Sequence, residues 1–301
     1  MKTKFREMRM SKANRVRLDE INSIISEYQV QGYVLTLRQL YYQLVSRDII
    51  PNQQKEYAKL STILKEGRMS GIVDWGAIED RLRQPSSPSS FESPEEVMDA
   101  VISQYALPRM AGQPVYVEVW VEKDALSGVL KRVTEKYHIP IMVNRGYSSA
   151  SAMHDAFQRF VWNGAYKRKP IKLIYLGDFD PSGLDMIRDI TERIEEFQFG
   201  YDDGTDVEGM IFEVVPIALT EDQIDEYAPP PNPAKVTDPR AKDYIRRHGD
   251  TSWEVDALPP QVLNRLLEVA ILKYINVEEF EKVLEKEKTD KTRLKSLKEY
   301  L

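Results

Sequence analysis

The chain has 301 residues, of which 42% are hydrophobic and 30% are charged, a composition that fits a soluble globular protein with two domains. It contains no cysteine, which excludes disulfides and thiolate metal sites. The three histidines, His138, His154 and His248, are too far apart in sequence for a zinc motif. We find no signal peptide and no apolar run of about 18 residues, so we expect a cytoplasmic protein without a membrane partner.

The net charge of -6 is unevenly distributed along the chain. Residues 1–85 carry 15 Lys and Arg against 10 Asp and Glu, whereas residues 86–301 carry 27 against 38. A basic N-terminal unit on an acidic body favours a polyanion such as DNA as the partner of that unit. An excess of this size is also ordinary for a small domain, so charge alone leaves both interpretations open.

Residues 1–83 are predicted to form a small helical domain. The segments with helical periodicity are Ala13–Tyr28, Leu37–Val45 and Lys55–Lys65. Gly67 and Gly71 are expected to bracket a turn, and Ile72–Trp75 is predicted to be a short strand. Three helices followed by a strand-bearing turn are typical of a winged helix, a helix-turn-helix variant whose later helix can enter the major groove of DNA.

Residues 84–112 are predicted to form a linker and a helix, because residues 84–92 are rich in Pro and Ser and Ser93 opens a capping box. Residues 113–220 then alternate strands with helices, which predicts an α/β domain with a mostly parallel sheet covered on both faces. The predicted strands are Val115–Val121, Pro140–Val143, Ile171–Leu176 and Ile211–Ile217, and the predicted helices are Ala125–Tyr137, Ser149–Trp162 and Leu184–Phe197.

Residues 221–301 are predicted to form a loop and a helical extension. The stretch from Ala228 to Asp250 is rich in Pro and charge, and we expect it to be a surface loop. Gln261–Tyr274 has a strong apolar stripe and is predicted to be a helix, followed by a polar helical tail over residues 277–301. The acidic segment Trp253–Asp256 is interpreted as structural.

Acidic residues follow two of the predicted strands. Asp178 and Asp180 come directly after Ile171–Leu176, and their spacing of two places both side chains on the same side of a strand. Glu122 ends the strand Val115–Val121. The carboxyl ends of parallel strands lie at one edge of a sheet, so Glu122 can face the Asp pair. Such carboxylates repel each other unless a cation lies between them, and a hard ion such as Mg²⁺ suits oxygen ligands.

Glu122 after one apolar strand, and Asp178-Phe179-Asp180-Pro181-Ser182-Gly183 after another, resemble the Toprim domain that topoisomerases, bacterial primases and some nucleases share. The resemblance covers about residues 113–217. The Pro-x-Gly after the Asp pair is similar to one branch of that family, the A subunit of topoisomerase VI and the meiotic double-strand-break transesterases. In that branch the matching Glu and two Asp bind magnesium, which implies this role for Glu122, Asp178 and Asp180.

Proteins of that branch also carry a winged helix with the motif Arg-x-x-Tyr-Tyr, whose second tyrosine attacks DNA. Arg38-Gln39-Leu40-Tyr41-Tyr42 matches this motif, which implies that Tyr42 is the catalytic nucleophile and that Arg38 assists it. Tyr41 lies on the apolar stripe of its helix and is expected in the core, whereas Arg38 lies four residues before Tyr42 and on its face. A guanidinium favours the phenolate, which otherwise needs a pH of about 10. An ordinary surface aromatic remains the alternative for Tyr42.

Lys59, Lys65 and Arg68 are candidate DNA-phosphate contacts, because residues 64–71 look like the Lys-Gly-containing turn of the family's winged helix. Arg145 precedes Gly146 in the position of a Gly-rich turn of the family, although the residues differ, and it is a weaker candidate. A solvated charged face is an equally open interpretation for any one of these side chains.

The leading hypothesis is a homodimeric, magnesium-dependent enzyme that cuts double-stranded DNA through a phosphotyrosyl intermediate. Tyr42 of one subunit would meet the metal site of the other. The sequence has no P-loop and nothing like the ATP-binding fold of a B-type subunit, so strand passage would require a separate ATPase partner. A nucleoid-associated location in the cytoplasm follows from this hypothesis.

Two rival hypotheses stay open. The first is a Toprim nuclease in which Glu122, Asp178 and Asp180 activate water and Tyr42 takes no part. The second is a non-catalytic DNA-binding protein with a vestigial acidic site.

Overall fold

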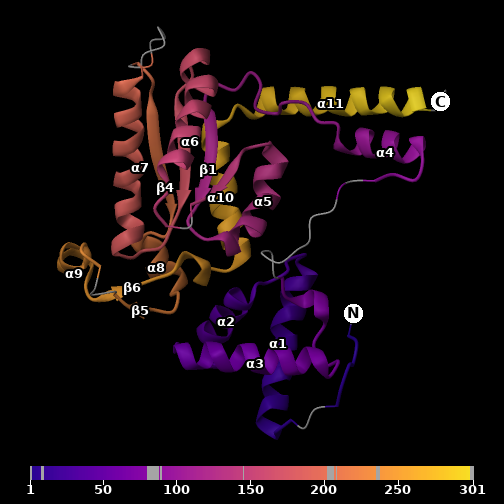
Figure 1. The fold of residues 1–301 in the computed structure, drawn as a ribbon, viewed down its shortest axis with the longest axis vertical. Coiled ribbons are helices and arrows are strands. Elements are labelled where there is room, and N and C mark those ends of the chain that lie inside the picture. Colours follow the sequence, from indigo (N-terminus) through magenta and orange to yellow (C-terminus); the bar gives the residue numbers. More distant parts are fainter. Residues whose placement is uncertain are drawn as a thin grey trace.

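A computed structural model describes residues 2–7, 10–79, 88, 90–144, 146–201, 207, 209–234 and 238–298. Figure 1 shows two bodies: a small helical one formed by the N-terminal residues, and an α/β body from which two helices project. The N-terminal elements are the helices α1 Lys12–Val30, α2 Leu37–Ser46, α3 Gln54–Met69 and the 3₁₀ turn η1 Trp75–Ala77. Of the described residues, no helix is long and apolar enough to cross a membrane.

The three predicted N-terminal helices are confirmed, with α3 longer than expected. Thr36 caps α2 in a capping box with Gln39, which explains where this helix begins. Gly67 does not bracket a turn as predicted but lies within α3. A Cβ at this position would lie 2.6 Å from Leu18 Cδ2. The glycine therefore permits close packing of α3 on α1.

The predicted strand Ile72–Trp75 is wrong. Asp74 accepts a hydrogen bond from the Gly76 amide at 2.8 Å and starts η1, so the backbone turns where the strand was expected. Within the described part of this domain, β pairing is limited to the isolated bridges Lys4–Ser70 and Leu35–Ile78. The structure thus shows a helical N-terminal domain, and the wing of a winged helix is not confirmed.

The α/β body is built on a four-stranded parallel sheet with the strand order β2-β1-β3-β4. Its strands are β1 Tyr116–Val121, β2 Ile141–Val143, β3 Ile171–Leu176 and β4 Phe212–Ala218. The connecting elements are α5 Asp124–Tyr137, α6 Ala150–Asn163, η3 Ala165–Lys167 and α7 Pro181–Gly200. Each predicted strand and helix of this region is confirmed to within a few residues, because their apolar periodicity is strong.

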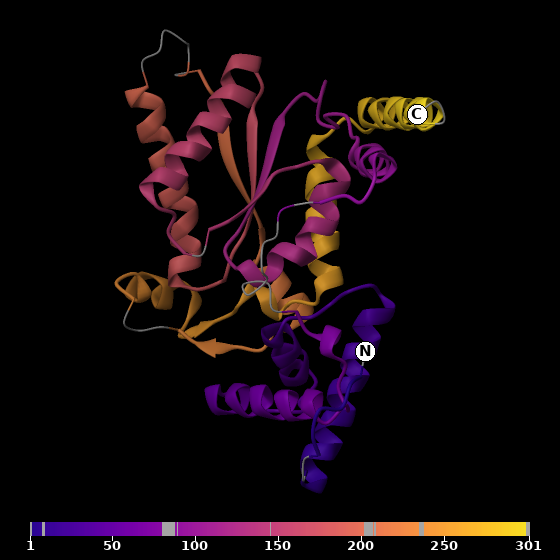
Figure 2. The same ribbon diagram turned by 45° about the vertical axis from the view of Figure 1, so that its right-hand side comes forward.

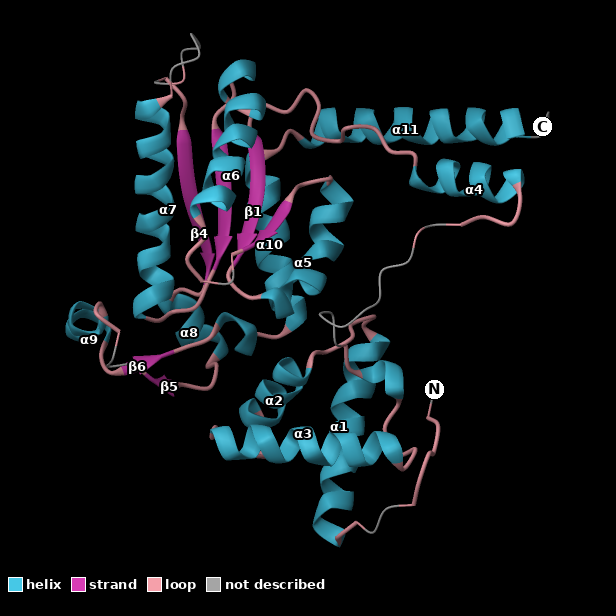
Figure 3. Ribbon diagram, viewed as in Figure 1, coloured by secondary structure: helices cyan, strands magenta, loops and turns pink. Residues whose placement is uncertain are grey.

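Apolar side chains cover both faces of the sheet, as predicted. On one face, Trp120 and Tyr175 pack with Phe157 of α6 and Met186 of α7. On the other face, Val119 and Ile174 belong to a core that includes α5 and the C-terminal helix α10 Pro260–Tyr274. Figure 3 shows that the strand arrowheads point toward the N-terminal domain, so the carboxyl edge of the sheet faces that domain.

The C-terminal region is more ordered than the surface loop expected over residues 228–250. After α8 Glu221–Tyr227, the chain forms β5 Asn232–Pro233, α9 Ala241–His248, β6 Thr251–Ser252 and the 3₁₀ turn η4 Val255–Ala257. Tyr244 of α9 is 5% exposed, and its hydroxyl donates to the carbonyl oxygens of Phe179 and Thr251. This tyrosine fastens the region to the carboxyl edge of the sheet.

The helices α4 Pro94–Gln104 and α11 Val277–Lys298 lie side by side and project from the α/β body, away from the N-terminal domain (Figure 2). Ser93 caps α4 as predicted, and α11 confirms the helical tail. Glu287 of α11 joins this arm to the body, because its carboxylate accepts from the Arg109 guanidinium at 2.9 and 3.2 Å and from the Leu107 amide at 3.1 Å. The predicted linker 84–92 lies mostly outside the described residues.

We predict that Glu287→Gln lowers the free energy of unfolding at neutral pH by about 1–3 kcal/mol, because it weakens a buried charged hydrogen-bond pair. Arg109 lowers the pKa of Glu287 to about 2. The wild-type advantage is therefore complete above the unfolded-state pKa of about 4.3 and disappears as the pH falls toward 2. Urea unfolding of both proteins between pH 2.5 and 7 checks this, and a pH-independent difference would contradict it.

Candidate functional site at the domain interface

The ends of the neighbouring strands β1 and β3 bring Glu122 and Asp178 together. Val121 pairs with Leu176 in the sheet, and the Glu122 amide donates to the Leu176 carbonyl at 2.9 Å. The Asp178 amide then donates to Glu122 Oε2 at 2.9 Å. The prediction that Glu122 faces the Asp pair is thereby confirmed for Asp178, because parallel strands end at a common edge.

Asp180 lies at the N-terminus of α7, where it is 6% exposed. Its Oδ1 accepts from the Ser182 hydroxyl at 2.9 Å and from the Gly183 amide at 2.7 Å, so this carboxylate caps the helix. A Cβ at position 183 would lie 2.2 Å from the Asp178 carbonyl oxygen, so the turn requires glycine there. The Pro-Ser-Gly segment thus starts α7 while it keeps both aspartates at the sheet edge.

Crowding and burial raise the proton affinity of this acidic centre. Burial raises the pKa of Glu122 to about 7, with added repulsion from Asp178 and Asp180. Burial also raises the pKa of Asp178, although the charge of Lys123 opposes that change. Buried carboxylates that repel one another are stabilised by a cation, and their hard oxygens are the donors that Mg²⁺ prefers. The donor chemistry fits the magnesium that the resemblance implies.

The same oxygens have protein partners in this conformation. Asp178 Oδ1 accepts from the Val255 amide at 2.9 Å and lies 2.8 Å from Lys123 Nζ. Over the ranges that the structure describes, no three His, Cys, Asp or Glu side chains are arranged as ligands of one ion. For Glu122, Asp178 and Asp180 to share an ion, some of these oxygens would have to exchange partners.

Lys123 lies at the centre of a charge cluster that the sequence did not reveal. Its Nζ is 2.8 Å from Asp178 Oδ1, 2.8 Å from Glu254 Oε2 and 2.8 Å from Asp256 Oδ1. Burial alone lowers the pKa of Lys123, but Asp256 and Asp178 raise it above its usual value. Lys123 is therefore a largely buried ammonium, 16% exposed, that is shared by carboxylates from two distant parts of the chain.

Glu254 and Asp256 belong to a segment that crosses the carboxyl edge of the sheet, the acidic arm (residues 253–256). The backbones of Trp253 and Phe179 exchange two hydrogen bonds at 2.9 and 3.0 Å, which hold the acidic arm against the loop between the two aspartates. The sequence interpretation treated this arm as structural. Its two acidic residues at a spacing of two, the same spacing as in Asp178 and Asp180, were the signal that could have marked it.

Arg38 of α2 reaches the same carboxylates from the N-terminal domain. Its guanidinium pairs with Glu254 Oε2, and its Nε lies 2.8 Å from Asp256 Oδ2. The Arg38 Cζ lies 5.8 Å from the centre of the Tyr42 ring, which agrees with the predicted placement of both side chains on one helix face. The structure therefore brings Arg38, Tyr42 and the acidic centre to one interface within a single chain.

Tyr42 is buried rather than on the surface, with an exposed fraction of 4%. Burial and the charge of Asp256 raise the pKa of Tyr42, and Arg38 and Lys123 only partly counteract them. The expected activation of the phenol by Arg38 is thus outweighed in this conformation. The side chain of Tyr42 is therefore covered in this conformation.

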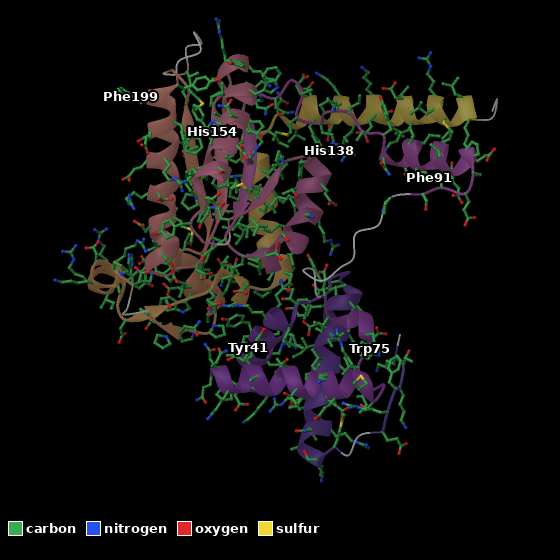
Figure 4. The ribbon with its side chains drawn as sticks, in the orientation of Figure 1. Tyr41, Trp75, Phe91, His138, His154 and Phe199 are labelled. Atoms are coloured by element: carbon green, nitrogen blue, oxygen red, sulfur yellow. The ribbon has the colours of Figure 1, made fainter. Side chains whose placement is uncertain are left out.

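Tyr41 packs in the core, as predicted, beside α3 (Figure 4). Its hydroxyl donates to Asn52 Oδ1 at 3.0 Å, and the Asn52 amide donates to Asn232 Oδ1 at 2.9 Å in the α/β body. Asn232 in turn interacts with the Tyr42 hydroxyl. Polar side chains therefore join the domains on the other side of the tyrosine pair.

The predicted DNA contacts differ in their surroundings. Lys59 is exposed and pairs with Glu56 at 2.7 Å, and Lys65 is exposed on α3. Arg68 donates to the carbonyl oxygens of Trp75 and Ile78, so it also holds the segment after α3 in place. Arg145 lies outside the described residues.

A cavity of about 500 Å³ lies between the N-terminal domain and the start of α5. Arg38, Lys65 and Arg68 contribute to its wall on the N-terminal side, and Asp124 does so on the α5 side. The cavity places three cationic side chains along one opening to the interface. The acidic side chains of Glu79 and Asp124 line the same cavity.

Comparison of the sequence with protein-family models and with curated proteins finds no match. The roles assigned to these residues therefore rest on the motifs and on the geometry of the interface.

We predict that Glu122→Gln stabilises the metal-free protein at pH 8 by on the order of 1–3 kcal/mol in the free energy of unfolding. A carboxyl group with a raised folded-state pKa destabilises the fold as the pH rises from about 4.5 through 7. The gain should therefore fade below pH 4.5, and the amide oxygen can still accept from the Asp178 amide. Unfolding in EDTA measures the effect, with the exposed Glu135→Gln as the control. Equal stability of Glu122→Gln and wild type at pH 8 would contradict it.

Proposed function

We propose that this protein is a magnesium-dependent, DNA-cleaving transesterase related to the A subunit of topoisomerase VI, with Tyr42 as its nucleophile. The observation that carries the proposal is the meeting of two separate motifs at one interface. Arg38 and Tyr42 of the N-terminal domain lie against carboxylates that contact Lys123, which itself lies beside Glu122 and Asp178. Residues without a shared role would not be expected to meet in this way across a domain boundary.

In the proposed reaction, Tyr42 Oη forms a bond with a phosphorus atom of the DNA backbone, and the bond from that phosphorus to one deoxyribose oxygen breaks. The phenol gives up its proton, and the departing sugar oxygen gains one. Arg38 would hold the phosphate and favour the phenolate. The phosphotyrosyl bond conserves the energy of the broken linkage, so resealing requires no ATP.

Glu122, Asp178 and Asp180 would hold the magnesium, which when bound would neutralise charge on the phosphate. The raised pKa of Glu122 supports a cation at this position, because a bound cation would offset the repulsion among the carboxylates. In this proposal the α/β body is a Toprim domain and the N-terminal domain is a DNA-binding winged helix. Lys59, Lys65 and Arg68 would contact flanking phosphates.

The cleavage of both strands would require two copies of the chain, and a homodimer matches the two-fold symmetry of duplex DNA. Tyr42 lies beside the acidic centre of its own chain in this structure. An exchange between subunits would therefore follow the opening of this interface. A separate ATPase subunit and an association with the nucleoid belong to the same proposal.

We predict that Tyr42→Phe abolishes covalent capture of DNA, because it removes the attacking oxygen. Tyr41→Phe is the matched control on the same helix, and it should retain most of the activity despite the lost hydrogen bond to Asn52. The assay incubates supercoiled plasmid with Mg²⁺ and then compares gels before and after protease treatment. Cleaved DNA that enters the gel only after proteolysis is the expected result for wild type.

The same assay distinguishes the rival hypotheses. Full cleavage by Tyr42→Phe, without attached protein, would favour a nuclease that uses water at Glu122, Asp178 and Asp180. Retention of DNA without any cleavage, unchanged by Asp178→Ala and Asp180→Ala, would favour a binding protein. Either result would contradict the proposed tyrosine mechanism.

A further inference from the structure

We infer that Arg38 and Lys123 form a two-cation binding site for a DNA backbone phosphate, and that the acidic arm fills this site in the closed conformation. The inference rests on the proposed function and deepens it, since it assigns a DNA-binding role to Lys123 and an inhibitory role to Glu254 and Asp256. The proposed ligand is a phosphodiester. In this structure the carboxylates of Glu254 and Asp256 occupy the positions that its oxygens would take.

The geometry of the cluster supports this assignment. Arg38 from the N-terminal domain and Lys123 from the α/β body share the same two carboxylates, Glu254 and Asp256. A guanidinium and an ammonium that converge on the oxygens of two carboxylates match the way in which these groups bind phosphate. The two cations of the site come from different domains. The site therefore exists only while the two domains face each other.

The carboxylates are held in place by their backbone. The acidic arm is anchored by the paired backbones of Trp253 and Phe179, and the Val255 amide donates to Asp178 Oδ1 at 2.9 Å. The Asp256 side chain is fully buried, whereas the side chain of Glu254 is 23% exposed. Backbone hydrogen bonds therefore hold the arm in place, and the Glu254 side chain is partly accessible to solvent.

Arg38 can be reached from the cavity between the domains, which Glu79 and Asp124 also line. The Arg38 side chain is 42% exposed and lines the cavity of about 500 Å³ together with Lys65 and Arg68. These side chains would attract a phosphate toward Arg38. The incoming phosphate and the carboxylates of the acidic arm carry charge of the same sign, so both cannot be held by Arg38 and Lys123 together.

The consequence is a coupling between DNA binding and the exposure of Tyr42. In the closed conformation, Arg38 is held by the acidic arm and Tyr42 is 4% exposed. A phosphate that displaced Glu254 and Asp256 would take over their contacts with Arg38 and Lys123, and the Asp256 carboxylate would no longer be held beside Tyr42. The tyrosine would then become accessible to DNA only when a phosphate occupies this site.

The test measures the affinity of a short DNA duplex for the full chain in EDTA, so that cleavage does not interfere. The double variant Glu254→Gln with Asp256→Asn should bind at least about tenfold more tightly than wild type, because two competing anions have been neutralised. Asp225→Asn with Glu226→Gln removes the same amount of charge from the exposed face of α8 and controls for long-range electrostatics. Addition of Lys123→Gln to the double variant should remove most of the gain.

If the double variant does not fold, the single variant Glu254→Gln, at the partly exposed position, should give a smaller gain of the same sign in DNA affinity. Circular dichroism checks the folding of each protein.

The outcomes separate the inference from the proposed function. If wild type and the double variant bind DNA with equal affinity, the inference is overturned and the proposed function is left intact. The same holds if the α8 control gains as much affinity as the double variant. The absence of DNA binding by every folded variant would overturn both. A gain in affinity that persists after Lys123→Gln would exclude Lys123 from the phosphate site.

Discussion

The ion pairs of the Lys123 ammonium are the interaction on which the arrangement of this interface depends. The ammonium contacts Asp178 at the end of β3 and both carboxylates of the acidic arm, and those carboxylates in turn hold Arg38 of the N-terminal domain. One cation therefore connects the sheet edge, the C-terminal region and the small helical domain. Without it, several carboxylates would be buried close together with little compensation, which is strongly unfavourable.

This cluster gives the interface two opposing properties. Its ion pairs join Arg38 of the N-terminal domain to Glu254 and Asp256 of the acidic arm, so they hold the domains in one relative position. They also use the groups that the proposed chemistry requires, since Arg38 and Asp178 are occupied by protein partners and Tyr42 is covered. A protein that cuts DNA must avoid uncontrolled cleavage, and a conformation with an inaccessible nucleophile would meet that need. In the proposed account, DNA supplies the anions that release these groups.

Much of the fold could be predicted from the sequence, because the α/β body has strong apolar periodicity and parallel strands end at one edge. The proximity of Glu122 and Asp178 follows from that rule alone. The failures have local causes. Asp74 starts a turn that overrides the strand-like run Ile72–Trp75, and two-residue strands such as β5 and β6 leave no periodic signal. Two of the three acidic partners of Lys123, Glu254 and Asp256, lie more than 130 residues away, so only the folded chain reveals them.

The central claim is that Tyr42 attacks DNA at this interface. The most direct measurement is mass spectrometry of the protein after incubation with DNA and Mg²⁺, followed by nuclease and trypsin digestion. Cleavage after Arg38 and Arg47 releases a peptide that contains both tyrosines of α2, and fragmentation separates Tyr41 from Tyr42. The account predicts a residual nucleotide on Tyr42. Cleaved DNA without a modified tyrosine, or a nucleotide attached to another residue, would contradict it.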